Sequence, residues 1–377
     1  MMRRREALGP LLAGALGGFV PVKAWPQDGK PAGPTAPGVC QVVDMSLAQQ
    51  DVSKNFLIGS RAAWQEINSR GGVKGRKVRH VVLETDGSVA SLRSAYETAR
   101  DDAANIAFAG SAGDPLAQGL AQLMARDNLT MAHLAPWLQS RAFDGDGRAL
   151  PAFASRSEQL EHAIKSLSVM GMTEVGAVYA GSTEHAVYHD DIERSCSALK
   201  LRARHFQPGG DIAALGQRMA PGTPAVLLFL GGTPELAQFT QGLETQSRQR
   251  YLIAMADVNL QTLQQMGAAR KTPVIATQVV PVTNSSLPVV RAYRESLTKF
   301  FDEPPTPLSL AGYISARLTA EVLSSVDGAW SRASVLAVAQ KTSSLDIGGF
   351  RVVFSGQRRL SSYVTQSMLT ADGRVLG

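Results

Sequence analysis

The chain has 377 residues, of which 44% are hydrophobic, and a formal net charge of +6. This length exceeds one ordinary hydrophobic core and suits two lobes of roughly 100–200 residues each. Half of the net charge, +3, falls in the first 24 residues (Arg3, Arg4, Arg5 and Lys23 against Glu6). The remainder has no basic patch interleaved with aromatic residues, which argues against nucleic acid as a partner.

The N-terminus has the pattern of an export signal. Arginines at residues 3–5 precede an apolar run over residues 7–20, and Val22-Lys23-Ala24 is typical of a cleavage site. The run is shorter than the roughly 20 residues that span a bilayer, which argues against stable membrane insertion. We predict a signal peptide at 1–24, export to the periplasm by the Sec or the twin-arginine route, and a flexible leader at 25–38 that is rich in Pro and Gly.

Beyond the leader, strand and helix patterns alternate along the chain. In the first half, strands are predicted near 41–46, 78–84, 105–110 and 129–134, with helices near 55–69, 89–103 and 115–126. In the second half, strands are predicted near 174–180, 201–206, 224–230, 250–255 and 273–280, with helices near 157–170, 186–199, 211–219, 234–246 and 258–267. Such alternation predicts α/β halves with parallel sheets.

The remaining residues are predicted to return to the first half and then close the second. Helices are expected near 286–301, 308–326 and 332–341, followed by strands at 347–354 and 361–369. The predicted fold is α/β, with two doubly wound lobes joined by about three hinge crossings. Lobe I comprises 39–153 and 279–343, and lobe II comprises 154–278 and 344–377.

The most informative segment is Gly59–Arg76. It predicts a helix, a Gly71-Gly72 exit and a following strand, hence a βαβ unit whose ligand-side loop lies at the carboxyl edge of the sheet. Its residues 62–76 resemble the A-x-x-x-I-N-x-x-G-G-I-x-G-R block of the type I periplasmic binding proteins, the branched-chain amino-acid (Leu/Ile/Val-binding) family of ABC-transporter solute receptors. The segments 229–234 and 347–354 carry further similarity to that family.

Ser111 and Ala112 lie in the turn Gly110-Ser111-Ala112-Gly113, between a predicted strand and a predicted helix. As a binding loop, the hydroxyl of Ser111 and neighbouring backbone N–H groups would accept a carboxylate or carbonyl of a ligand. The resemblance implies such a Ser/Thr-rich loop here. An α/β hydrolase that uses Ser111 as nucleophile is the alternative, although no histidine follows His205 in the chain.

Ala135 and Trp137 follow the fourth predicted strand, where the family has another ligand loop. Trp137 replaces the threonine-like hydroxyl of that loop, so it would either stack on the ligand or plug the core. Ser46 lies at the end of the first predicted strand. The family has a ligand-contacting loop at this position, but the sequence of that loop differs in this chain.

Three more candidates belong to lobe II. The resemblance implies that Tyr188 forms a ligand wall and that Thr233 and Asp257 lie on cleft loops, with Asp257 pairing with a ligand ammonium group. Asp257 could instead cap a helix starting at Val258. His185 and His189 lie four apart, but no third ligand appears at a recognisable spacing, so the sequence predicts no metal site and no cofactor. Cys40 and Cys196 are predicted to be free, buried thiols.

These observations predict a monomeric, non-catalytic receptor. The resemblance implies that it captures a small polar or amino-acid-like solute between its lobes and delivers it to an inner-membrane ABC permease. A receptor that reports the ligand to a signalling partner stays open as an alternative.

Overall fold

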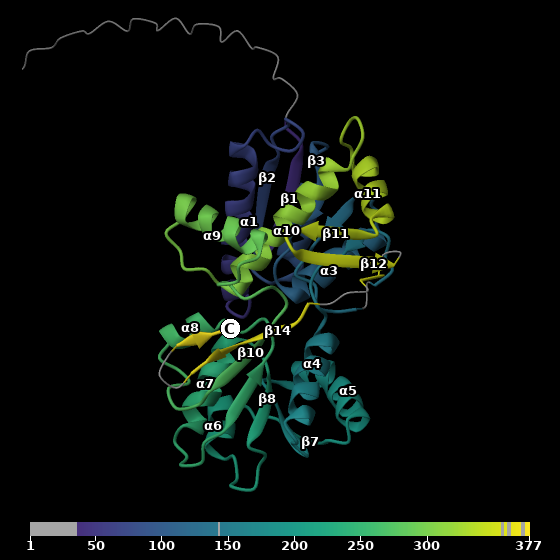
Figure 1. The fold of residues 1–377 in the computed structure, drawn as a ribbon. Coiled ribbons are helices and arrows are strands. Elements are labelled where there is room, and N and C mark those ends of the chain that lie inside the picture. Colours follow the sequence, from purple (N-terminus) through teal and green to yellow (C-terminus); the bar gives the residue numbers. More distant parts are fainter. Residues whose placement is uncertain (1–35, 142–143, 356–357, 360–362, 371–373) are drawn as a thin grey trace, which may run out of the picture. The chain divides into compact units, whose positions relative to one another are not determined.

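The computed structural model describes residues 36–377 except 142–143, 356–357, 360–362 and 371–373. The predicted signal peptide and nearly all of the predicted leader therefore lie outside the described residues. Within residues 36–377, the described elements alternate between strands and helices much as the sequence predicts (Figure 1).

The first sheet is parallel throughout and has the strand order β2-β1-β3-β4-β5 in the described part of the chain. Its elements are β1 (Gly38–Asp44), α1 (Gln50–Ser69), β2 (Arg79–Thr85), α2 (Val89–Asp101), β3 (Asn105–Ala109), α3 (Asp114–Arg126), β4 (Ala132–Leu134) and β5 (Ala149–Leu150). Both faces of β1 are buried, because Val39 and Val43 belong to one core cluster and Cys40 and Val42 to another. Helices therefore cover both faces, as in a doubly wound lobe.

The second sheet has the order β15-β14-β10-β9-β8-β6-β7 within the described residues. Its elements are α4 (Arg156–Val169), β6 (Glu174–Tyr179), α5 (Ser182–Ala198), β7 (Arg202–Phe206), α6 (Ile212–Gln217), β8 (Val226–Leu230), α7 (Thr233–Leu243), β9 (Tyr251–Ala254), α8 (Leu260–Gln265), β10 (Val274–Gln278), β14 (Thr365–Leu369) and β15 (Val375–Leu376). Along β8, Leu227 and Phe229 belong to the core cluster formed with α6 and α7, whereas Leu228 and Leu230 belong to the one formed with α4 and α5. This alternation explains the continuous apolar run.

The chain then returns to the first sheet through α9 (Pro288–Phe300), α10 (Pro307–Ser324) and α11 (Arg332–Lys341). Two glycines allow α1 and α10 to pack with their backbones in contact. A Cβ on Gly59 would lie 1.7 Å from the carbonyl oxygen of Ser309, and one on Gly312 would lie 1.9 Å from that of Phe56. The segment Gly59–Arg76, singled out in the sequence, is thus fixed against a helix about 250 residues further along the chain.

The strand at 347–354 does not extend the second sheet, contrary to the prediction that it closes lobe II. β11 (Ser344–Ile347), β12 (Phe350–Ser355) and β13 (Arg358–Arg359) form a separate antiparallel sheet. Gly348 and Gly349, both at positive φ, turn the chain between β11 and β12. Phe350 then packs near Phe153 in the core that includes α1 and α10, with 6.4 Å between ring centroids. β14 and β15, further along the chain, pair in the second sheet.

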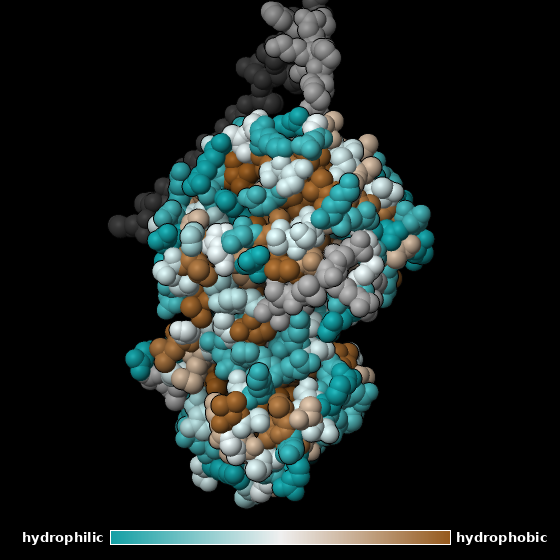
Figure 2. All heavy atoms as spheres, turned by 45° about the vertical axis from the view of Figure 1, so that its right-hand side comes forward, coloured by the Kyte–Doolittle hydropathy of each residue, from teal (hydrophilic) through white to brown (hydrophobic). Residues whose placement is uncertain are grey.

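Cys40 and Cys196 are buried and free, as predicted. Burial raises the pKa of Cys40 to about 12 and that of Cys196 to about 11. On the face shown in Figure 2, hydrophobic residues form small areas separated by hydrophilic ones. None of the described helices has both the length and the apolar composition required to cross a bilayer.

Candidate functional site: a cleft between the two sheets

A cavity of about 540 Å³ lies where the carboxyl ends of strands from both sheets meet. Its volume falls within the range of small-molecule sites. Side chains from the ends of strands and the beginnings of helices line it, among them Asp44, Asp51, Asp114, Arg156, Glu184, Tyr188, Thr233 and Asp257. Five of these are carboxylates and one is a guanidinium, so the charge of the lining is mainly negative.

Asp257 connects the two halves of this site. Its Oδ1 accepts hydrogen bonds from Trp137 Nε1 and Gln139 Nε2, each over 2.6 Å. Burial raises the pKa of Asp257, and the hydrogen bond from Trp137 acts in the opposite direction. Asn259, rather than Asp257, caps α8, because its side chain accepts the N–H groups of Gln261 and Thr262. The helix-cap interpretation of Asp257 is therefore wrong.

Asp51 makes a second connection between the sheets. It lies in the first turn of α1 and accepts hydrogen bonds from the hydroxyls of Thr233, over 3.2 Å, and Thr262, over 2.9 Å. Burial raises the pKa of Asp51, while these two hydroxyls lower it. Thr233 also accepts the backbone N–H of Asn259. The carboxylate of Asp51 thus holds the starts of α7 and α8 beside α1.

Arg156 forms the cationic part of the lining. It is the first residue of α4, and its guanidinium pairs with the buried carboxylate of Asp114 at the start of α3. The same guanidinium lies over the ring of Tyr188, 5.4 Å from its centroid. Arg156 Nε is buried and has no hydrogen-bond partner in the described part of the chain. Asp114 therefore neutralises much of the charge of Arg156. The described hydrogen bonds to Asp51 and Asp257, by contrast, all come from uncharged donors.

The structure separates the sequence-derived candidates into two groups. Tyr188, Thr233 and Asp257 line the cavity. Ser46 lies beside it, because its backbone N–H donates to Asp44 Oδ1 over 2.8 Å and Asp44 is part of the lining.

The four candidates from the Ser111 and Ala135 loops are buried behind the lining. The backbone N–H of Ala112 donates to Val42 and that of Ala135 donates to Leu150, so both groups are used within the protein. Trp137 directs its indole N–H to Asp257. Of these four residues, Trp137 is bonded to the lining through Asp257, and the carbonyl of Ala112 accepts the backbone N–H of Asp44.

Ser111 is fully buried, and its Oγ lies 2.9 Å from His133 Nε2. A serine hydrolase needs a histidine that accepts the serine proton and a third group that orients the ring. Burial lowers the pKa of His133 to about 3, and its Nδ1 has no hydrogen-bond partner among the described residues. This geometry is that of a structural Ser–His pair.

Sequence reasoning missed Asp51, Asp114 and Arg156. Each lies in the first turn of a helix, and α1 and α3 both follow the carboxyl ends of strands in the first sheet. Charged residues at such positions are candidates for a ligand site at the sheet edge. That positional signal could have identified all three.

The fold and the cleft define a ligand-binding protein of two α/β parts, with a site formed from both. The profile of the family described as "Periplasmic binding protein" matches residues 39–372. The chain belongs to this family, whose members are substrate-binding proteins rather than enzymes, and it is a solute-binding receptor.

Solved structures with low sequence identity share the fold. An extracellular ligand-binding receptor from Verminephrobacter eiseniae ef01-2 is 18% identical with a TM-score of 0.82, over 91% of this chain and 100% of that chain. A substrate-binding periplasmic protein from Ralstonia solanacearum is 19% identical with a TM-score of 0.80, over 90% and 99%. An ABC transporter substrate-binding protein from Desulfitobacterium hafniense, solved in complex with Leu, is 17% identical with a TM-score of 0.71, over 90% and 100%. No curated protein sequence matches the chain.

Proposed function

We propose that this protein is exported to the periplasm, captures a small solute carrying an amino group in the cleft, and delivers it to an inner-membrane ABC permease. The observation that carries the proposal is the pair of partly buried carboxylates, Asp51 and Asp257, at a cavity lined from both sheets. Withdrawing a carboxylate from water without a cation is costly, and a ligand ammonium group would supply the opposite charge. The ligand is accordingly amino-acid-like.

Arg156 adds a second element of recognition. Its Nε, which has no partner within the described ranges, would offer a donor to a ligand carboxylate close to the ring of Tyr188. An amino acid carries both of the groups that such a site would satisfy. The structure from Desulfitobacterium hafniense in complex with Leu supports this ligand class.

Calorimetric titration of the mature protein tests the proposal with matched ligands. Each amino acid or amide in the panel is compared with the same molecule lacking its α-amino group, for example leucine with 4-methylpentanoate. We expect binding by at least one amino compound and much weaker binding by its desamino partner. Desamino compounds that bind as tightly as the amino compounds would overturn the proposal.

Two variants localise the effect. Asp257→Asn and Asp51→Asn remove the charge but keep an oxygen acceptor, so each should weaken binding by about 10- to 100-fold, as expected for a charge-assisted hydrogen bond. Asp302→Asn is the control, because Asp302 is exposed and does not line the cavity. Affinity unchanged in both cleft variants would place the ligand elsewhere.

A further inference from the structure

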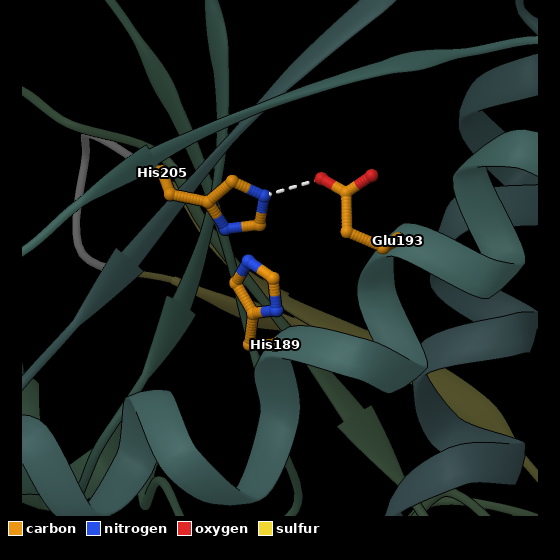
Figure 3. A group of neighbouring side chains, drawn as sticks. All are labelled: His189, Glu193 and His205. Atoms are coloured by element: carbon orange, nitrogen blue, oxygen red, sulfur yellow. Dashed lines mark hydrogen bonds and ion pairs between the residues drawn. The ribbon is translucent and has the colours of Figure 1, made fainter.

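Three potential metal ligands meet between α5 and β7 of the second sheet, and none of them is part of the cleft lining. They are His189 and Glu193 of α5 and His205 of β7, and one ligand atom from each lies within 4.8 Å of the others. Figure 3 shows the two imidazoles and the carboxylate converging on the space between the helix and the strand. Among the described residues no other such group of three was found.

The local fold explains this convergence. His189 and Glu193 are four residues apart, so they lie on the same face of α5. β7 is an edge strand of the sheet, and α5 packs against it. His205 Nε2 lies 2.6 Å from Glu193 Oε1, and the rings of His189 and His205 are 4.5 Å apart at their centroids. Small side-chain movements would therefore place all three on one ion.

A neighbouring hydroxyl supports His205 in the way that metal-bound histidines are usually supported. Tyr179 Oη lies 2.7 Å from His205 Nδ1, on the other side of the ring from Glu193. A metal-ligating imidazole generally donates its second N–H to an acceptor, which fixes the tautomer and ring orientation. When Tyr179 accepts from Nδ1, the lone pair of Nε2 is on the side of the ring that faces Glu193.

We propose that His189, Glu193 and His205 form a binding site for a divalent transition-metal ion, with Zn²⁺ as the best match. Two imidazoles and one carboxylate are a ligand set that zinc uses, with water at the fourth position. The side chains of His189, His205 and Glu193 are 37%, 20% and 50% exposed, so an ion and its water have access. The site is independent of the proposed solute specificity.

The sequence pattern suggested a different pair. His185 and His189 also lie four apart, but His185 packs edge-on against Tyr179, with 4.9 Å between ring centroids. His185 therefore packs beside the cluster. The two other potential ligands that lie near His189 are Glu193 and His205 of β7.

An ion held there would connect α5 to the edge strand β7. α5 also carries Tyr188, which lines the cleft, so the metal would stabilise an element of the solute site without contacting the solute. An ion that binds only the folded state raises its stability by mass action.

The test uses tag-free mature protein treated with EDTA, because a polyhistidine tag would itself bind zinc. Calorimetry with Zn²⁺ should show one site, and Co²⁺ should give visible absorption bands of a low-coordinate site. His189→Gln, Glu193→Gln and His205→Gln should each weaken Zn²⁺ binding by at least about tenfold and remove the Co²⁺ bands. His162→Gln, a histidine on α4 outside the cluster, is the matched control and should change neither.

Thermal unfolding gives an independent measurement. Zn²⁺ should raise the unfolding midpoint of the parent protein and of His162→Gln, but not that of the three cluster variants. Failure of the parent protein to bind one equivalent at about 100 µM free Zn²⁺, a concentration that would nearly saturate a micromolar site, would overturn the proposal. So would stoichiometric binding that survives unchanged in all three variants.

Discussion

The indole N–H of Trp137 donates to the partly buried carboxylate of Asp257 over 2.6 Å. Trp137 belongs to the segment between β4 and β5 of the first sheet, and Asp257 follows β9 of the second. One hydrogen bond thus joins the two sheets beside the solute cleft. It also assigns Trp137 a role that its hydrophobic character alone does not suggest.

Trp137→Phe should destabilise the protein by about 1–3 kcal/mol, because Asp257 loses a donor in a buried environment. Urea unfolding followed by circular dichroism measures the change. Trp330→Phe is the matched control, since Trp330 Nε1 is buried and no described residue accepts its proton, so that its loss removes no described hydrogen bond. Equal destabilisation by both substitutions would mean that ring volume, rather than the bond to Asp257, accounts for the effect.

Ser111→Ala should lower the unfolding free energy by about 1–3 kcal/mol, because His133 Nε2 loses its buried partner. Ser197→Ala, at an exposed position of α5, should have little effect. A serine-directed phosphonate should leave Ser111 unlabelled, since the hydroxyl is fully buried and none of the described carboxylates is paired with His133. Stoichiometric labelling at Ser111 would instead favour the hydrolase alternative.

Gly312→Ala should be strongly destabilising, by more than about 2 kcal/mol. The added Cβ would lie 1.9 Å from the carbonyl oxygen of Phe56, and rigid backbone on α1 cannot move aside as a flexible side chain could. Gly222→Ala is the control because a Cβ there meets no atom within 4 Å. Thermal unfolding midpoints compare the two, and similar midpoints would show that α1 and α10 are less tightly packed than described.

Two histidines of the first sheet, the buried His133 and the half-buried His80, should make the protein sensitive to acid. Burial lowers the pKa of His133 to about 3, and burial, with a smaller effect of Arg61, lowers that of His80 to about 4. The unfolded pKa is about 6.5, so between these values the unfolded state binds more protons. The unfolding free energy should therefore fall as the pH drops from about 6.5 to 4, by about 1.4 kcal/mol per pH unit for each histidine.

Urea unfolding at several pH values measures this slope. His133→Asn should reduce it by about one proton. Asp51 and Asp257 have raised pKa values and act in the opposite direction above about pH 3.8, but they are common to the parent and the variant and cancel in the comparison. A slope that is the same in His133→Asn as in the parent would show that His133 is protonated in the folded state.

Export should remove residues 1–24 or close to them, a prediction that rests on sequence because these residues lie outside the described part. Mass spectrometry of periplasmic protein should give an N-terminus near Trp25. An intact Met1 on the periplasmic protein would contradict the cleavage site. Replacing Arg4 and Arg5 by lysine separates the routes, because loss of export indicates the twin-arginine pathway and unchanged export indicates Sec.

The sequence by itself determined the alternation of strands and helices and the family. These depend on local patterns, such as the apolar run of β8 and the Gly71-Gly72 exit after α1, where both glycines have positive φ. Periodicity and turn chemistry act over a few residues, so they can be read from the chain directly. The resemblance to the family also pointed to Tyr188, Thr233 and Asp257, because each lies in or next to a segment that the family places at the cleft. All three line the cavity.

Only the tertiary structure decided which polar groups face the cleft and which partners they have. Ser111 had the right loop for a ligand contact, but packing turned its hydroxyl to His133, 22 residues further along. Asp51 meets Thr262 across 211 residues, and β12 packs on the first core rather than on the second sheet. His189 and His205 come together because β7 pairs with β6, which places the strand that carries His205 beside α5. Such contacts depend on how distant elements pack, for which sequence spacing carries no signal.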